Sequence, residues 1–258
     1  MKTRGAPTMT EPERYSFSRL TSFETCPYGW YQTYVEGKEG EGNAFSDYGT
    51  LLHSILERYA TGLLRLDELY PTYANEFSSV GEFPSLKYAP NMRQSYFDAG
   101  AEYLKNFAGY DDYEVLACEE TFELPIDDFI YNGIVDLLLK DAYGNLILID
   151  YKSKSGFASV RERESYLRQP YSYSAWVEQR FGKKPDIIKF VMIRGTDFIT
   201  TFDEKKYQAT LQWIRDTVKQ IRAAWSFPAK PNQWFCSALC DHRGYCEQKD
   251  EQYGTQDV

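Results

Sequence analysis

The chain has 258 residues, 43% of them hydrophobic, and a net charge of −9. This length allows one large domain with a sizeable core, and no apolar run reaches the roughly 18 residues that a membrane helix needs. The polar N-terminus lacks the apolar segment of a secretory signal. We therefore exclude a membrane protein and a disulfide-rich secreted protein, and we expect a cytoplasmic protein with polar tails at 1–14 and 251–258.

Charge is distributed unevenly along the chain. Residues 106–139 contain nine acids and no Lys or Arg, whereas residues 151–194 contain ten basic residues and four acids. The overall negative charge predicts weak non-specific binding to DNA, but a local balance of +6 is compatible with a basic groove on one face. Nucleic acid therefore remains a candidate substrate.

The N-terminal part of the chain is predicted to be helical. Capping residues, glycines and apolar spacing mark the segments. In chain order they are a short helix from Ser16 to Cys26-Pro27, a polar loop at 37–46, an amphipathic helix from Tyr48 to Gly62, and helices at about 66–78 and 92–108.

The pattern changes to short runs typical of strands in the middle of the chain. Strands are predicted at 113–124, 129–139, 145–152, 186–195 and 197–202. Helices are predicted at 163–182, where Pro170 indicates an irregular first turn or a later start, and from the N-cap Asp203 onward. This order predicts an α/β fold with a mixed central sheet flanked by helices, in a single domain over 15–250. A helical insertion is expected at about 60–110 and the core at about 111–227.

Two acids and a lysine are predicted to meet on the central strands. Side chains repeat every two residues along a strand, so Asp150 and Lys152 share a face, and a hairpin brings Asp136 close to Asp150. Two carboxylates about 4 Å apart repel by about 4 kcal/mol at an effective dielectric near 20. A divalent cation would remove that repulsion, and carboxylate and carbonyl oxygens suit Mg²⁺ or Mn²⁺. The alternative is two strand-ending acids, one of them paired with the lysine.

Three of the five cysteines lie close together in the sequence. Cys236, Cys240 and Cys246 fall within eleven residues, and Cys26 lies near the other end of the chain. Such a set in a reducing compartment predicts a metal or iron–sulfur site. Cys118, inside a strand pattern, is expected to be a core thiol.

Five segments, taken in order, resemble the PD-(D/E)XK nucleases, specifically the RecB-like branch, over nearly the whole chain. They are SFSRLTSFETCPYGWY, GTLLHSILE, GIVDLLL, LIDYKS and QPYSYSAW. The resemblance implies a restriction-endonuclease-like fold and a Mg²⁺- or Mn²⁺-dependent DNA exonuclease acting on single strands or ends. Its setting would be recombination, repair, phage DNA processing or CRISPR adaptation. The alternative is a non-catalytic subunit that binds DNA and a protein partner in a recombination or CRISPR-adaptation complex.

The resemblance also implies roles for single residues of the metal site. His53, Asp136 and Asp150 would bind the metal, helped by the backbone carbonyl of Tyr151. Lys152 would be the catalytic lysine, acting together with the two aspartates. It would hold an attacking water or stabilise the phosphate in the transition state.

Further site residues are implied on the first strand and on the helix after the hairpin. The family places an acid on the first strand, which Glu119 or Glu120 could supply, and the spacing favours Glu119. Gln169 and Tyr173 lie one helical turn apart and would line the path of the DNA.

The cysteines match a subset of this branch that includes AddB and the CRISPR spacer-acquisition nuclease. In that subset one N-terminal and three C-terminal cysteines hold a [4Fe–4S] cluster, which implies that Cys26, Cys236, Cys240 and Cys246 do so here. The cluster would clasp the N-terminal helical part to the segment 232–248. The first C-terminal gap is three residues, one more than the subset's usual spacing. A zinc ion on the same thiolates is the chemical alternative.

Overall fold

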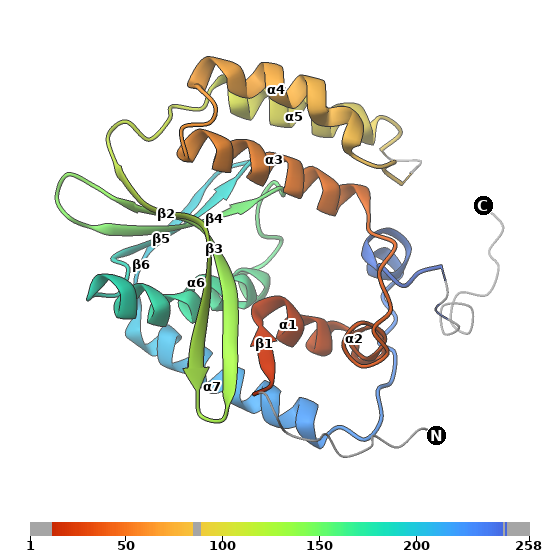
Figure 1. Ribbon diagram of the computed structural model, residues 1–258. Helices are drawn as coiled ribbons and strands as arrows, with labels where there is room; N and C mark the ends of the chain where they lie inside the picture. The colour runs from red at the N-terminus through yellow and green to blue at the C-terminus, as the bar shows by residue number, and fades with distance from the viewer. Residues whose placement is uncertain (1–11, 85–88, 245, 247–258) are drawn as a thin grey trace. The chain divides into compact units, whose positions relative to one another are not determined.

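The computed structural model describes residues 12–84, 89–244 and 246 (Figure 1). The chain forms two compact units. The first consists of Met1–Gly42, Glu123–Gly133 and Gln208–Val258, and the second of Asn43–Phe122 and Ile134–Tyr207. Most of the two predicted tails lies outside the described residues, and the predicted domain boundaries stay a prediction. Within the described residues, no helix is both long and apolar enough to cross a membrane.

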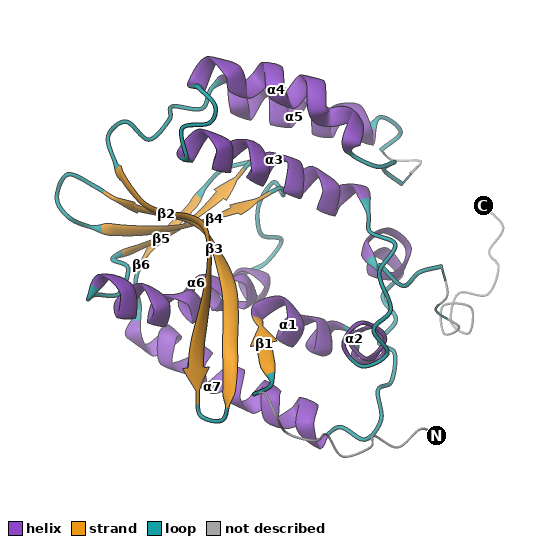
Figure 2. Ribbon diagram, viewed as in Figure 1, coloured by secondary structure: helices purple, strands orange, loops and turns teal. Residues whose placement is uncertain are grey.

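Apart from β1 and α2, which the sequence did not predict, helices and strands follow the predicted order (Figure 2). The strands are β1 (Arg14–Ser16), β2 (Glu114–Ile126), β3 (Phe129–Lys140), β4 (Leu146–Lys152), β5 (Ile187–Met192) and β6 (Phe198–Thr201). The α-helices are α1 (Phe17–Thr25), α2 (Pro27–Tyr34), α3 (Ala44–Ala60), α4 (Leu69–Glu76), α5 (Met92–Lys105), α6 (Val160–Phe181) and α7 (Glu204–Ala223). Short 3₁₀ turns, η1 (Leu66–Glu68) and η2 (Phe77–Ser79), flank α4, and a π-helical turn, η3 (Phe235–Leu239), lies in the segment predicted as coil.

The second unit is built on a mixed sheet, as predicted. β3 and β4 are antiparallel with Leu137 opposite Ile149, β4 and β5 are parallel, and β5 and β6 are antiparallel. β2 pairs with β3 on its other side. The tight β3–β4 turn depends on Gly144, whose φ of 83° lies in the left-handed region that glycine adopts without strain. This register places Asp136 and Asp150 one residue beyond the Leu137–Ile149 pair, on adjacent strands.

One face of this sheet is covered by α3, α4 and α5 (Figure 2). Asn43 caps α3 by accepting a hydrogen bond from the amide of Ser46. The helix then buries one stripe in the core, where each fully buried aliphatic side chain contributes about 1.5–3 kcal/mol. Core members from helices and sheet include Leu52, Ile55, Leu69, Tyr73, Leu104, Leu137, Ile149 and Val191. This packing fixes α3 over the end of the sheet.

The other face carries α6, which differs from its prediction. The helix begins after the N-cap Ser159, whose hydroxyl accepts from the amide of Glu162, and it continues through Pro170. The expectation that Pro170 marks the start or an irregular first turn is therefore wrong. Proline costs one backbone hydrogen bond there, but the helix is held by burial of its middle. Trp176, for example, stacks on Phe122 of β2.

The first unit contains a second helix that the sequence did not predict. Pro27 follows the end of α1, as expected, but it is also the first residue of α2, where a missing N–H is tolerated. α2 places Trp30 in an aromatic cluster, stacked on Phe227 and edge-on to Phe23. In the same unit β1 pairs in parallel with residues 130–132 of β3.

Candidate functional site

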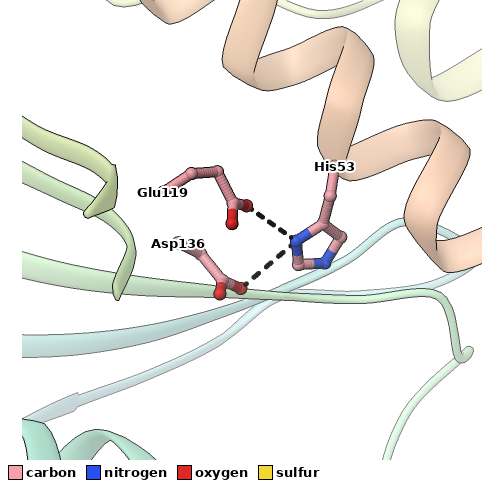
Figure 3. Close-up of side chains that lie close together, drawn as sticks. All are labelled: His53, Glu119 and Asp136. Carbon is pink, nitrogen blue, oxygen red and sulfur yellow. Dashed lines mark hydrogen bonds and ion pairs between the residues drawn. The ribbon is translucent and has the colours of Figure 1, made fainter. Parts of the chain in front are cut away.

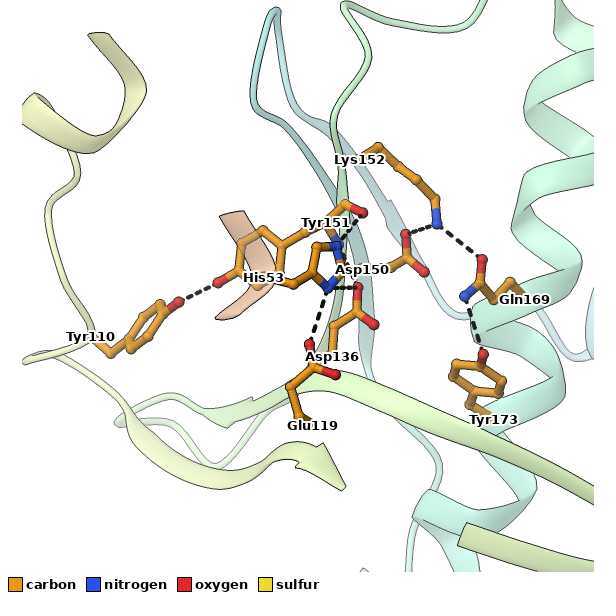
Figure 4. A network of polar contacts seen from close by, with 9 residues as sticks. All are labelled: His53, Tyr110, Glu119, Asp136, Asp150, Tyr151, Lys152, Gln169 and Tyr173. Atoms are coloured by element: carbon orange, nitrogen blue, oxygen red, sulfur yellow. Dashed lines mark hydrogen bonds and ion pairs between the residues drawn. The ribbon is translucent and has the colours of Figure 1, made fainter. Parts of the chain in front are cut away.

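His53 on α3 faces two carboxylates (Figure 3). A backbone carbonyl lies beside the same imidazole (Figure 4). Its Nδ1 lies 3.0 Å from Glu119 Oε1 and 3.8 Å from Asp136 Oδ2, and its Nε2 lies 3.3 Å from the Tyr151 carbonyl oxygen. Burial lowers the pKa of His53, but the neighbouring carboxylates outweigh it and raise that pKa to about 9. In the absence of a metal the imidazole is therefore cationic at neutral pH.

Glu119 reaches His53 through an unusual backbone conformation. Its φ is 46°, in the left-handed region that non-glycine residues rarely occupy. The alternation of buried side chains along β2 shifts by one residue near Glu119. Before it Ala117 is buried, and after it the buried residues are Phe122 and Leu124, which lie five and seven residues from Ala117 rather than an even number. One extra residue is therefore inserted, as in a β-bulge, and such bulges re-aim side chains near sites. Glu120 lies instead 3.9 Å from Arg180.

Asp136 is buried and lies on β3 beside Asp150. Its Oδ2 accepts a hydrogen bond of 2.8 Å from the amide of Tyr151. Burial raises the pKa of Asp136 to about 7, and the charge of Asp150 adds to this effect against His53 and Lys152. This is the carboxylate repulsion that the sequence predicted.

Asp150 and Lys152 emerge from β4 on the side facing α6 (Figure 4). Lys152 Nζ lies 2.5 Å from Asp150 Oδ2, whose side chain is 5% exposed. Burial lowers the pKa of Lys152, but Asp150 and Asp136 raise it by more, so the ammonium stays charged. Within the described residues neither Asp150 oxygen accepts a hydrogen bond of good geometry. A buried carboxylate in this state has capacity left for a cation.

A chain of side-chain hydrogen bonds extends from Lys152 along α6 (Figure 4). Lys152 Nζ donates to Gln169 Oε1 at 3.0 Å, and Gln169 Nε2 donates to the Tyr173 hydroxyl at 3.1 Å. The structure thus brings together the lysine and the two helix residues that the sequence singled out. Gln169 fixes the position of the ammonium, and Tyr173 fixes that of the amide.

The chemistry of the cluster fits a divalent cation. Ligand atoms of His53, Glu119 and Asp136 all lie within 4.8 Å of one another. Asp150 is not in this group and lies 2.5 Å from Lys152 Nζ, so its role as a metal ligand stays a prediction. One imidazole with two carboxylates suits Mn²⁺ well, and the oxygens suit Mg²⁺. The Tyr151 carbonyl lies beside the other nitrogen of the same imidazole, Nε2, and its role as a metal ligand stays a prediction.

Two residues near the candidate sites, Tyr110 and His242, were missed from the sequence. The Tyr110 hydroxyl hydrogen-bonds the Tyr151 hydroxyl (Figure 4), a contact between a loop and β4 that no local pattern signals. Cys118 packs against the core as expected, and burial raises the pKa of its thiol to about 12. In the first unit His242 is buried, with Nε2 2.8 Å from Thr33 Oγ1.

The four remaining cysteines line one small cavity in the first unit. Cys26, Cys236, Cys240 and Cys246 surround it together with His242. Among the residues that the structure describes, no three cysteine sulfurs lie within 4.8 Å of one another. The thiols thus share a cavity without forming a tight tetrahedral set.

Comparisons with known proteins found a family profile, curated relatives and similar solved structures. Residues 14–247 match the profile of the PD-(D/E)XK nuclease superfamily. One of the subunits of the ATP-dependent helicase/deoxyribonuclease of Streptococcus agalactiae, in three strains, is 29% identical over 158 residues, which are 56% of this chain. The chain spans only 14% of the length of these relatives. A solved structure from Eubacterium rectale, described as a candidate exonuclease, is 14% identical with a TM-score of 0.49, covering 95% of this chain and 90% of that one.

Proposed function

Because the chain belongs to the PD-(D/E)XK nuclease superfamily, we propose that it is a metal-dependent DNA exonuclease of the RecB-like branch. It would hydrolyse phosphodiester bonds in single-stranded DNA or at DNA ends, in recombination, repair, phage DNA processing or CRISPR adaptation. DNA as substrate is supported by the deoxyribonuclease named in the Streptococcus agalactiae relatives. The net charge of −9 supports an enzyme that releases its substrate rather than one that grips duplex DNA.

The observation that carries this proposal is the cluster of ionisable side chains that α3, β2, β3 and β4 bring together. Glu119, Asp136 and Asp150 concentrate negative charge there, while His53 supplies a nitrogen ligand. A bound Mg²⁺ or Mn²⁺ would activate a water and neutralise charge on the phosphate. Asp136 and His53 would hold the ion, with Glu119 beside them and the Tyr151 carbonyl next to the imidazole.

The other residues position groups and stabilise charge. Lys152 keeps its proton beside two carboxylates, so we assign it to hold the attacking water or the phosphate oxygen that becomes more negative in the transition state. Asp150, 2.5 Å away, fixes the ammonium from one side and Gln169 fixes it from the other. Gln169 and Tyr173 would also line the path of the DNA.

Cleavage of end-labelled single-stranded DNA tests the proposal. Wild type with Mn²⁺ or Mg²⁺ should shorten the strand, wild type in EDTA should not, and Asp150→Ala should lose about two or more orders of magnitude in rate. An inert wild type that still shifts the DNA in a gel would favour the alternative, a non-catalytic protein that binds DNA within a larger complex. Equal cleavage by Asp150→Ala would contradict the assigned site.

We further propose that Cys26, Cys236, Cys240 and Cys246 hold a [4Fe–4S] cluster, which would join α2 to the C-terminal segment. The shared cavity supports this proposal. A single zinc ion, bonded at about 2.3 Å to each thiolate, needs every pair of sulfurs within about 4.6 Å. No three sulfurs in the described part of the chain are that close, so the thiols do not stand in the arrangement of a zinc site. A partner protein in recombination or CRISPR adaptation belongs to the same proposal.

Anaerobic purification tests the cluster. The protein should be brown, with visible absorbance and about four iron atoms per chain, and Cys240→Ala should lose both. A colourless sample that contains zinc would contradict the cluster and support the zinc alternative.

A further inference from the structure

A cavity of about 620 Å³ lies in the second unit, apart from the metal cluster. Its walls come from the end of α5, the following loop, and aliphatic side chains of β4 and β5. Its size falls in the range of small-molecule sites. None of the residues assigned above to metal binding by a side chain lines it; only Tyr151 belongs to both places.

Aromatic side chains dominate one part of this cavity. Tyr103, Phe107, Tyr110 and Tyr113 come from α5 and the loop after it, and Tyr151 comes from β4. Tyr110 and Tyr151 are joined through their hydroxyls (Figure 4). Aromatic rings offer π-faces to any planar base, which makes such a lining suitable for nucleobases.

A basic residue, Arg194, also lines the cavity. Arg194 lies over the Tyr96 ring, 3.7 Å from its centroid, and among the described residues its buried Nε has no hydrogen-bond partner. Lys189, the other basic residue of the lining, is 2.8 Å from Asp197 and so is neutralised. No acid of the described residues forms an ion pair with Arg194, and a guanidinium in this state suits a phosphate, which it can bind with two parallel hydrogen bonds.

The backbone next to Arg194 is held tightly. A Cβ at Gly195 would collide with the Ser155 carbonyl oxygen, so only glycine fits at this approach. Ser155 follows β4 by three residues, and the close approach ties the Arg194 turn to the segment that leaves the metal site. The cation is thus anchored beside the cavity rather than carried on a free loop.

We propose that this cavity binds a nucleoside 5′-monophosphate, with the base among Tyr103, Tyr110 and Tyr113 and the phosphate at Arg194. The choice of ligand rests on the proposed function, because hydrolysis at a DNA end adds water across a P–O bond and releases such a monophosphate. Tyr151 forms a wall of the cavity, while its backbone carbonyl and amide contact His53 and Asp136. The cavity is therefore a product site behind the metal centre.

Isothermal titration with dAMP in EDTA tests the site without any DNA cleavage. Wild type and Asp150→Ala should both bind one dAMP per chain, and Arg194→Gln should bind at least tenfold more weakly. Arg180→Gln is the matched control, since Arg180 lies on α6 and does not line the cavity, and it should bind as wild type does. Absence of binding by wild type, or equal binding by Arg194→Gln, would overturn the proposal.

A second variant covers the case in which Arg194→Gln does not fold. Ala108 is exposed and lines the cavity, so Ala108→Trp should fold and block dAMP; unchanged dAMP affinity in this variant would overturn the site. Failure of the nuclease proposal is a separate result. A wild type that binds dAMP but never cleaves DNA would refute the nuclease and leave the cavity assignment intact.

Discussion

Raising the pH from 7 to 9 should strengthen Mn²⁺ binding by about two orders of magnitude. The metal requires a neutral imidazole, whereas Glu119 and Asp136 hold the metal-free His53 in its cationic form. Metal and proton therefore compete for the same nitrogen. The affinity for Mn²⁺ should rise with pH until the imidazole is already neutral in the metal-free protein.

The size of the effect follows from the pKa of His53, which is about 9. At pH 7, two units lower, about one imidazole in a hundred is neutral, which costs about 3 kcal/mol of binding free energy. The affinity should thus fall about tenfold per pH unit between 9 and 7. Below pH 7 the affinity should depend more steeply on pH, because Asp136, with a pKa of about 7, then also releases a proton when the metal binds.

Isothermal titration of metal-free protein with Mn²⁺, in buffers of different ionisation enthalpy, measures both affinity and proton release. One proton should leave per metal at pH 8, and between one and two at pH 6.5. Glu119→Gln removes one of the carboxylates that raise the pKa of His53, so in this variant proton release at pH 8 should fall. A constant affinity from pH 7 to 8.5, or no proton release, would refute this account of the His53 environment.

Three further predictions concern stability and single side chains. The pKa of His53 is raised on folding, so its stabilising contribution is complete below pH 6.5 and is lost as the pH rises to about 9. Over this window the free energy of unfolding in EDTA should fall by up to about 3 kcal/mol, which lowers the Tm. Mn²⁺ should restore the Tm. Glu119→Ala should weaken Mn²⁺ binding about tenfold or more in titrations, while Glu120→Ala should not, and equal effects would contradict the bulge geometry. Lys152→Ala should slow DNA cleavage about 10²–10³-fold. The control Lys154→Ala removes a lysine paired with an acid of α6 and should cleave nearly as wild type. Comparable losses in the two variants would exclude a specific role for Lys152.

The pairing of Asp136 with Asp150 could be predicted because it depends on local rules. Strand side chains alternate with a period of two, and the short turn at Gly144 leaves few possible registers. The observed register, with Leu137 opposite Ile149, confirms that prediction. The Gln169–Tyr173 pair on one helix face follows from helical spacing in the same way.

The position of Glu119 could not be predicted from such local rules. An inserted residue shifts the alternation of β2 near Glu119, and a bulge depends on the partner strand rather than on the local sequence. Tyr110 was missed for a related reason, since its contact with Tyr151 joins residues 41 apart in the sequence. Pro170 shows the opposite error, because tertiary burial kept a helix that local propensity would have interrupted.

The central claim is that His53, Glu119 and Asp136 form a divalent-metal centre beside Lys152. Anomalous diffraction from crystals soaked in Mn²⁺ tests it directly. We predict a single strong peak at about 2.0–2.2 Å from His53 and Asp136 ligand atoms, which is lost in Asp136→Asn. Crystals of a protein that cleaves DNA with Mn²⁺, yet show no peak in this cluster, would contradict the account.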